Sequence, residues 1–89
     1  MIKEKFIIIN KLGLHDRAAA KLVATSARFE SEISLHCKGK TANAKSIMAV
    51  MMLAASINTE VEITANGEDA QAAVQAIIEL VNNKFGEGA

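Results

Sequence analysis

The chain has 89 residues, of which ten are basic and ten acidic, and 51% are hydrophobic. We expect one domain over residues 1–89, because this length holds a single core and the composition argues against disorder. The only cysteine, Cys37, excludes an internal disulfide framework and a four-cysteine zinc site, and it favours a reducing, cytoplasmic compartment. A net charge of zero gives no general attraction to nucleic acid, and no apolar run approaches the roughly 18 residues of a membrane span.

The first half of the chain alternates strand and helix patterns. Residues 5–10 form a β-branched run of strand length, and Gly13 lies in the connection that follows. One broad apolar face predicts a helix over residues 16–29. Residues 32–37 alternate between apolar and polar side chains, as in a half-buried strand, and a Lys-Gly turn predicts a hairpin into a short strand over residues 40–42.

The second half of the chain predicts one strand between two helices. A serine at the N-cap position begins a short apolar helix over residues 46–56, and residues 59–65 alternate as a strand. Glu68 and Asp69 suit the N-terminus of a last helix, whose apolar stripe continues to Phe85. The order β-α-β-β-α-β-α predicts an α+β fold with helices on one face of a sheet. The pattern leaves the strand order open, and a ferredoxin-like arrangement also fits.

Charge is unevenly distributed along the chain. Residues 1–45 hold nine basic and four acidic side chains, whereas residues 46–89 hold one basic and six acidic. A basic half indicates an anionic ligand or partner surface, and ordinary scatter over a solvated surface is the alternative.

His15 lies in the segment GLHDRAAAKLV, between a glycine-containing turn and an alanine-rich helix. A neutral imidazole nitrogen is nucleophilic near neutral pH, so it can accept a phosphoryl group. The backbone N–H groups of Asp16, Arg17 and Ala18 would bind the phosphate oxygens at the helix start, and the Arg17 guanidinium adds a positive charge. These residues predict a phosphoryl-accepting site, and a plain surface histidine is the alternative they leave open.

Two segments resemble those of one family. GLHDRAAAKLV resembles the active-site segment of HPr, the histidine-containing phosphocarrier of the bacterial phosphotransferase system, and KSIMAVMMLA (residues 45–54) resembles its regulatory-serine segment. The resemblance implies an open-faced β-sandwich, in which three helices cover one face of a four-stranded antiparallel sheet. It also implies that Nδ1 of His15 is phosphorylated by phosphorylated enzyme I, ultimately from phosphoenolpyruvate. His15 then passes the group to an enzyme IIA domain, and Arg17 neutralises the phosphate.

Two residues depart from the family pattern. Ala18 stands where the family usually has proline, a mild change because alanine also favours a helix; proteobacterial and nitrogen-branch members often lack that proline. Asp16 favours the helix N-terminus but would repel a phosphate on His15. Our hypothesis is that Asp16 makes the phosphorylated state less stable and hence a readier donor.

The predicted helix over residues 46–56 is apolar almost all round, so we expect part of it to be exposed. The resemblance places a docking surface for enzyme I and enzyme IIA there, although methionines at helical spacing are more often core. That surface comprises Ala20, Ile47, Met48, Met51 and Met52. Ser46 is a natural helix cap. The resemblance also implies phosphorylation of Ser46 by an HPr kinase/phosphorylase, which would add negative charge to the docking surface and slow transfer.

We expect a monomeric phosphocarrier that works within a relay and is not a stand-alone enzyme. Two other functions remain as alternatives. One is a regulatory docking module controlled by Ser46, although such HPr paralogues generally lack the histidine that this chain keeps. The other is an acylphosphatase-like hydrolase, for which no second catalytic polar group lies at a readable spacing from Arg17.

His36 is expected on the polar face of its strand and Cys37 on the buried face. We expect no metal site and no cofactor.

Overall fold

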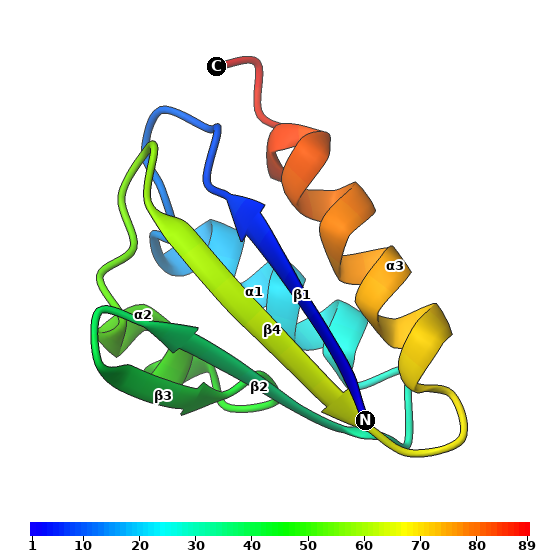
Figure 1. Cartoon of the computed structure of the whole chain (residues 1–89). Helices are drawn as coiled ribbons and strands as arrows, with labels where there is room; N and C mark the ends of the chain where they lie inside the picture. Colours follow the sequence, from blue (N-terminus) through cyan, green and yellow to red (C-terminus); the bar gives the residue numbers. More distant parts are fainter.

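Four segments with alternating side chains pair into one antiparallel sheet in the computed structural model, which describes all 89 residues (Figure 1). The strands are β1 (Ile2–Ile7), β2 (Glu32–Cys37), β3 (Lys40–Asn43) and β4 (Glu60–Asn66). Their order across the sheet is β1-β4-β2-β3, so β4 is inserted between β1 and β2. The ferredoxin-like alternative, in which β3 takes the inserted position, is therefore wrong.

The two faces of the sheet differ in chemistry, because successive side chains of a strand point to opposite faces. The register places Leu35 opposite Ile63 in β4 and opposite Ala42 in β3, so apolar side chains meet on one face. That face is buried and comprises Phe6, Ile8, Ile33, Leu35, Cys37, Ala42, Val61, Ile63 and Ala65. The opposite face is polar and carries Lys3, Lys5, Ser34, His36, Thr41, Glu62 and Thr64.

Three helices, α1 (Asp16–Ser26), α2 (Ile47–Met52) and α3 (Ala70–Asn82), cover the apolar face (Figure 1). Helix α1 packs against the other two, and α3 lies along β1 and β4. Their buried side chains complete the core: Ala18, Ala19, Leu22, Val50, Ala70, Ala73, Val74, Ile77 and Val81. The open-faced β-sandwich is thereby confirmed. None of these helices has the length and the apolar surface that a membrane span requires.

Two helices are shorter than the periodicity predicts. Helix α1 ends at Ser26 rather than at residue 29, because the N–H groups of Arg28 and Phe29 bond three residues back, in tighter turns. Helix α2 ends at Met52 rather than at residue 56, because Ala54 adopts a left-handed backbone (φ 53°) through which a helix does not continue.

The start of β1 and the role of Asp69 also differ from the predictions. Strand β1 begins at Ile2 rather than at residue 5, because its pairing with β4 starts there. Asp69 precedes α3 without capping it. Its carboxylate instead accepts hydrogen bonds from the N–H groups of Glu30 (2.9 Å) and Ser31 (3.0 Å). Asp69 thus ties the connection before β2 to the start of α3.

The chain reverses after α3 in a short turn, η1 (Lys84–Gly86), rather than continuing as helix to residue 85. All three residues have left-handed backbone, with φ of 55°, 54° and 78°. For Lys84 and Phe85 this conformation costs roughly 1–2 kcal/mol each. Burial of the Phe85 ring, which is 1% exposed, offsets that cost, and the Lys21 ammonium donates to the Phe85 carbonyl oxygen (2.6 Å). The turn brings the C-terminal residues to the N-terminal end of α1 (Figure 1).

Candidate functional site

The backbone before α1 fixes the position of His15. Gly13 has a φ of +68°, and a Cβ atom there would lie 2.4 Å from the carbonyl oxygen of Ala55. The next N–H, of Leu14, donates to that same oxygen (2.8 Å). His15 is the extended N-cap residue of α1, and its carbonyl accepts the helix hydrogen bond from Ala19 (2.8 Å). Only glycine suits this close approach and left-handed conformation, so the local sequence places His15 at the helix start.

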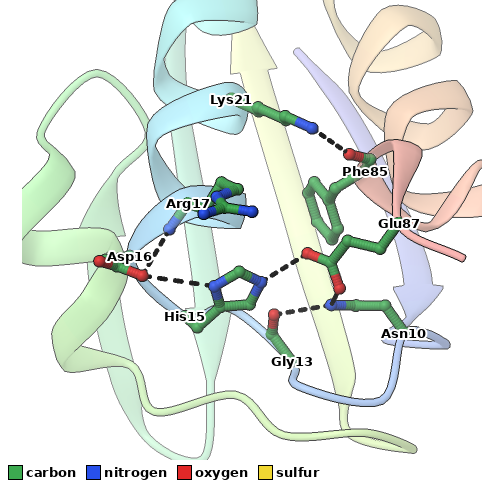
Figure 2. Close-up of polar contacts among 8 residues, drawn as sticks. All are labelled: Asn10, Gly13, His15, Asp16, Arg17, Lys21, Phe85 and Glu87. Atoms are coloured by element: carbon green, nitrogen blue, oxygen red, sulfur yellow. Dashed lines mark hydrogen bonds and ion pairs between the residues drawn. The ribbon is translucent and has the colours of Figure 1, made fainter. Parts of the chain in front are cut away.

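The His15 ring lies between two carboxylates (Figure 2). Its Nε2 is 2.5 Å from Oε2 of Glu87, and its Nδ1 is 3.4 Å from Oδ1 of Asp16. The side chains of His15 and Glu87 are 23% and 17% exposed, whereas that of Asp16 is 82% exposed. The hydrogen bond with Glu87, more than the one with Asp16, raises the pKa of His15, and the same bond lowers the pKa of Glu87.

Asp16 occupies part of the helix start that a phosphate would use. Its Oδ1 accepts the backbone N–H of Arg17 (2.8 Å) as well as facing His15. The hydrogen bond with His15 and then that with the Arg17 N–H lower the pKa of Asp16. One of the three N–H groups expected to bind phosphate is therefore already paired. Because Asp16 is exposed, its side chain can rotate away when an anion binds.

Arg17 contributes an unpaired guanidinium beside the imidazole. Its side chain is exposed, forms no salt bridge, and points toward the space next to His15 (Figure 2). Together these side chains line an open pocket of about 370 Å³, formed by Lys11, Leu12, His15, Arg17, Glu87 and Ala89. A guanidinium fork beside a nucleophilic nitrogen can hold the oxygens of a phosphoryl group.

Sequence reasoning missed two residues of this site, Asn10 and Glu87. Asn10 is fully buried, and its amide nitrogen donates to the Gly13 carbonyl (2.8 Å) and to Oε1 of Glu87 (3.1 Å). Its position as a polar residue after a buried apolar run was a signal that could have been noticed. Glu87 gave no such signal, because it lies 72 residues from His15 and only the left-handed turn directs it there.

The predicted docking residues of α2 form an exposed surface. Met48 and Met52 are 66% and 69% exposed, and Ile47 and Met51 are 40% and 38% exposed. Only Val50 of this helix is buried, so a core role for the three methionines is wrong. Ala20 is exposed on α1, the helix against which α2 packs.

Ser46 is the N-cap of α2, as predicted. Its Oγ accepts the backbone N–H of Ala49 (3.3 Å), and its own backbone is extended. Ser46 is half-buried beside the exposed residue Ile47.

Replacing Ser46 with alanine is expected to lower the free energy of unfolding by about 1 kcal/mol, because one helix-start N–H loses its acceptor. Ser46→Asp keeps an acceptor at the same place, so its loss should be smaller. Urea denaturation of the two variants checks this, and equal stability of Ser46→Ala and the unchanged protein would contradict the capping role.

The second histidine and the cysteine lie where the strand alternation predicts. His36, on the polar face of the sheet, forms hydrogen bonds with the hydroxyl groups of Thr41 (3.0 Å) and Thr64 (3.2 Å). Cys37 is buried in the core. No three His, Cys, Asp or Glu side chains come together in a way that could hold a metal ion.

A family model described as the PTS HPr component phosphorylation site matches residues 2–83. The chain belongs to the HPr family. The phosphocarrier protein HPr of Xylella fastidiosa strain 9a5c is 51% identical to it over 87 residues, which is 98% of each chain. A crystal structure of HPr-C-His from Thermoanaerobacter tengcongensis matches with a TM-score of 0.96 at 40% identity, and the match covers both chains completely.

HPr membership confirms the resemblance seen in the sequence and gives this chain the phosphocarrier function of the phosphotransferase system. Neither rival, the hydrolase or the purely regulatory module, is favoured by these relatives. A structure described as an HPr dimer from Thermoanaerobacter tengcongensis also matches, with a TM-score of 0.79 at 41% identity over 98% of this chain and 100% of that one. The monomeric state expected for this chain stays a prediction.

Proposed function

We propose that His15 of this HPr-family chain accepts a phosphoryl group from phosphorylated enzyme I and passes it to an enzyme IIA domain, in the cytoplasm. The observation that carries the proposal is the geometry around His15. Its Nε2 is hydrogen-bonded to Glu87, while Nδ1 faces the exposed Asp16 at the start of α1. Arg17 and the His15 ring both line the same open pocket.

In the proposed transfer the lone pair of Nδ1 attacks the phosphorus of the enzyme I phosphohistidine. The P–N bond on enzyme I breaks, and its electron pair returns to the enzyme I imidazole. The Arg17 guanidinium and the backbone N–H groups of Arg17 and Ala18 hold the phosphoryl oxygens as charge spreads over them. The reverse sequence of bonds delivers the group to enzyme IIA.

The exposed surface of α2 is proposed as the docking site for both partners. Met48, Met51 and Met52 offer flexible, exposed apolar side chains, with Ile47 on the same helix and Ala20 on the neighbouring helix. Methionine side chains adapt to differently shaped partners, which suits a carrier that must bind enzyme I and enzyme IIA in turn.

Phosphorylation of Ser46 by an HPr kinase/phosphorylase is proposed as a brake on this docking. A phosphate adds between about 1.5 and 2 negative charges at pH 7. Ser46 borders the apolar docking residues, so that charge would be placed against the partner. The Ser46→Asp variant, which keeps the cap, tests whether a charge at this position slows transfer without unfolding α2.

Replacing Asp16 with alanine is expected to slow hydrolysis of the phosphohistidine several-fold. This is the rate change that corresponds to the interaction energy of two exposed charges in water. The carboxylate of Asp16, 3.4 Å from Nδ1, would no longer repel the phosphate or compete with it for the Arg17 N–H. Release of inorganic phosphate from the purified phosphorylated protein measures this rate. Glu30→Ala is the control, and equally fast hydrolysis in Asp16→Ala would disprove the hypothesis that Asp16 makes the carrier a readier donor.

Intact-protein mass after incubation with enzyme I, Mg²⁺ and phosphoenolpyruvate tests the proposal itself. The expected result is one acid-labile phosphoryl adduct that is absent in His15→Ala and present in His36→Ala, which removes the other histidine. An adduct that survives in His15→Ala, or no adduct with active enzyme I, would show that His15 is not the acceptor.

A further inference from the structure

We propose that Glu87 is a positioning residue for His15, whose carboxylate keeps the ring proton on Nε2 and so leaves Nδ1 as the nitrogen that accepts the phosphoryl group. This inference rests on the proposed function, because it names what prepares His15 for that reaction. It concerns a residue outside both sequence segments that resemble the family.

The two contacts of the imidazole differ in strength. An ionised carboxylate only accepts hydrogen bonds, so each contact calls for a proton on the facing ring nitrogen. A neutral imidazole has one such proton to give. The Nε2 contact is 2.5 Å and partly buried, whereas the Nδ1 contact with Asp16 is 3.4 Å and exposed. The neutral ring therefore keeps its proton at Nε2 and has a lone pair at Nδ1.

The segment that carries Glu87 is held in place from several sides. Phe85 anchors it in the core, and the Glu87 N–H donates to the Lys84 carbonyl (2.9 Å). The buried amide of Asn10 donates to the second carboxylate oxygen of Glu87. Two residues further on, the carbonyl of Ala89 accepts the backbone N–H of Lys11 (3.2 Å). These contacts hold the strained backbone of Lys84 and Phe85 in a conformation that points Glu87 toward the imidazole (Figure 2).

The charges around the ring make Glu87 decisive. Asp16 draws a proton toward Nδ1, which opposes phosphorylation there, while the cationic side chains of Arg17 and Lys11, which line the same pocket, disfavour a positive charge on the ring. Besides its hydrogen bond with the ring, a third cation, Lys21, lowers the pKa of Glu87 and so helps to keep that carboxylate ionised. Without Glu87 the only carboxylate beside the ring faces Nδ1, so the proton would move toward the nitrogen that must be free.

The experiment compares Glu87→Ala, Glu87→Gln and the unchanged protein, with Glu79→Ala as a control at an exposed glutamate of α3. Ring ¹⁵N chemical shifts of His15 in the unphosphorylated full chain, recorded across pH, give the tautomer and the pKa. We expect the Nε2–H tautomer to dominate in the unchanged protein and in Glu79→Ala. In Glu87→Ala we expect a mixture of tautomers and a lower pKa, with Glu87→Gln between the two.

The rate of phosphorylation by phosphorylated enzyme I, measured across pH, is the second readout. In Glu87→Ala the rate should rise at lower pH than in the unchanged protein, because its imidazole loses its extra proton sooner. Its plateau at high pH should fall by about 10- to 100-fold, the cost of losing orientation at a reacting group. A dominant Nε2–H tautomer in Glu87→Ala, or an unchanged plateau, would overturn the role of Glu87.

The two proposals fail in different ways. A chain that enzyme I does not phosphorylate would overturn the proposed function, yet the tautomer and the pKa are read without any transfer. A native-like amide spectrum of Glu87→Ala shows that the fold is intact. Glu87→Gln, which keeps the size of the side chain, supplies the comparison if the alanine variant loosens the C-terminal segment.

Discussion

Replacing Arg17 with alanine is expected to slow phosphoryl transfer to His15 by about 100- to 1,000-fold, the usual cost of removing one preorganised donor to a developing charge. The Arg17 guanidinium forms no salt bridge and lines the pocket beside the His15 ring, so it is free to bind the phosphoryl oxygens. Arg17→Lys keeps the charge but loses the planar fork, so its transfer rate should lie between those of Arg17→Ala and the unchanged protein. Rapid-quench measurement with phosphorylated enzyme I gives these rates.

Arg28→Ala is the matched control for Arg17. Arg28 is an exposed arginine just beyond the C-terminal end of α1, where it lies over the Phe29 ring at 5.5 Å, away from the pocket. Its loss should leave the transfer rate unchanged. Equal rates for Arg17→Ala and Arg28→Ala would remove Arg17 from the proposed site and leave phosphate binding to the helix N–H groups alone.

Replacing Phe85 with alanine is expected to lower the free energy of unfolding by about 3–5 kcal/mol. The ring is almost fully buried, and a cavity would remain between the turn and the helices. The left-handed backbone of Lys84 and Phe85 would also lose the burial that offsets its cost. Urea denaturation followed by circular dichroism measures the loss.

The same variant should affect the site at a distance. With its anchor gone the turn relaxes, Glu87 leaves His15, and the pKa of His15 falls toward its ordinary value. Phe29→Ala, at a half-buried ring, is expected to cost less stability and to leave that pKa unchanged. A stable Phe85→Ala protein with an unchanged His15 pKa would show that the turn holds itself without the ring.

Much of the site follows from local sequence. Gly13 and the alanine-rich run after it predict the start of α1, and they place His15 and Arg17 together without any long-range information. The exposed methionines of α2 could be expected because a short helix that is apolar all round cannot be buried on every side in a small protein. The alternation in β2 and β4 likewise predicts which face of each strand is buried.

The parts that could not be predicted depend on tertiary packing. Nothing in the local preferences of Lys84 and Phe85 favours left-handed backbone. Tertiary contacts select it, namely burial of the Phe85 ring and the hydrogen bond from Lys21 to the Phe85 carbonyl. The sequence therefore gives no sign that Glu87 differs from any other charged residue near the chain end. Asp69 has the chemistry of a helix cap, but its carboxylate accepts hydrogen bonds from the N–H groups of Glu30 and Ser31 instead.

The hydrogen bond between Lys11 and Ala89 has a practical consequence for handling the protein. Any sequence fused after Ala89 would emerge at the mouth of the His15 pocket, where it could shield the imidazole or compete with an incoming enzyme. Met1 lies at the other end of the molecule (Figure 1), so an affinity tag or fluorophore attached there would leave the pocket clear. Paired N- and C-terminally tagged preparations would then differ in apparent activity although their sequences between the tags are identical.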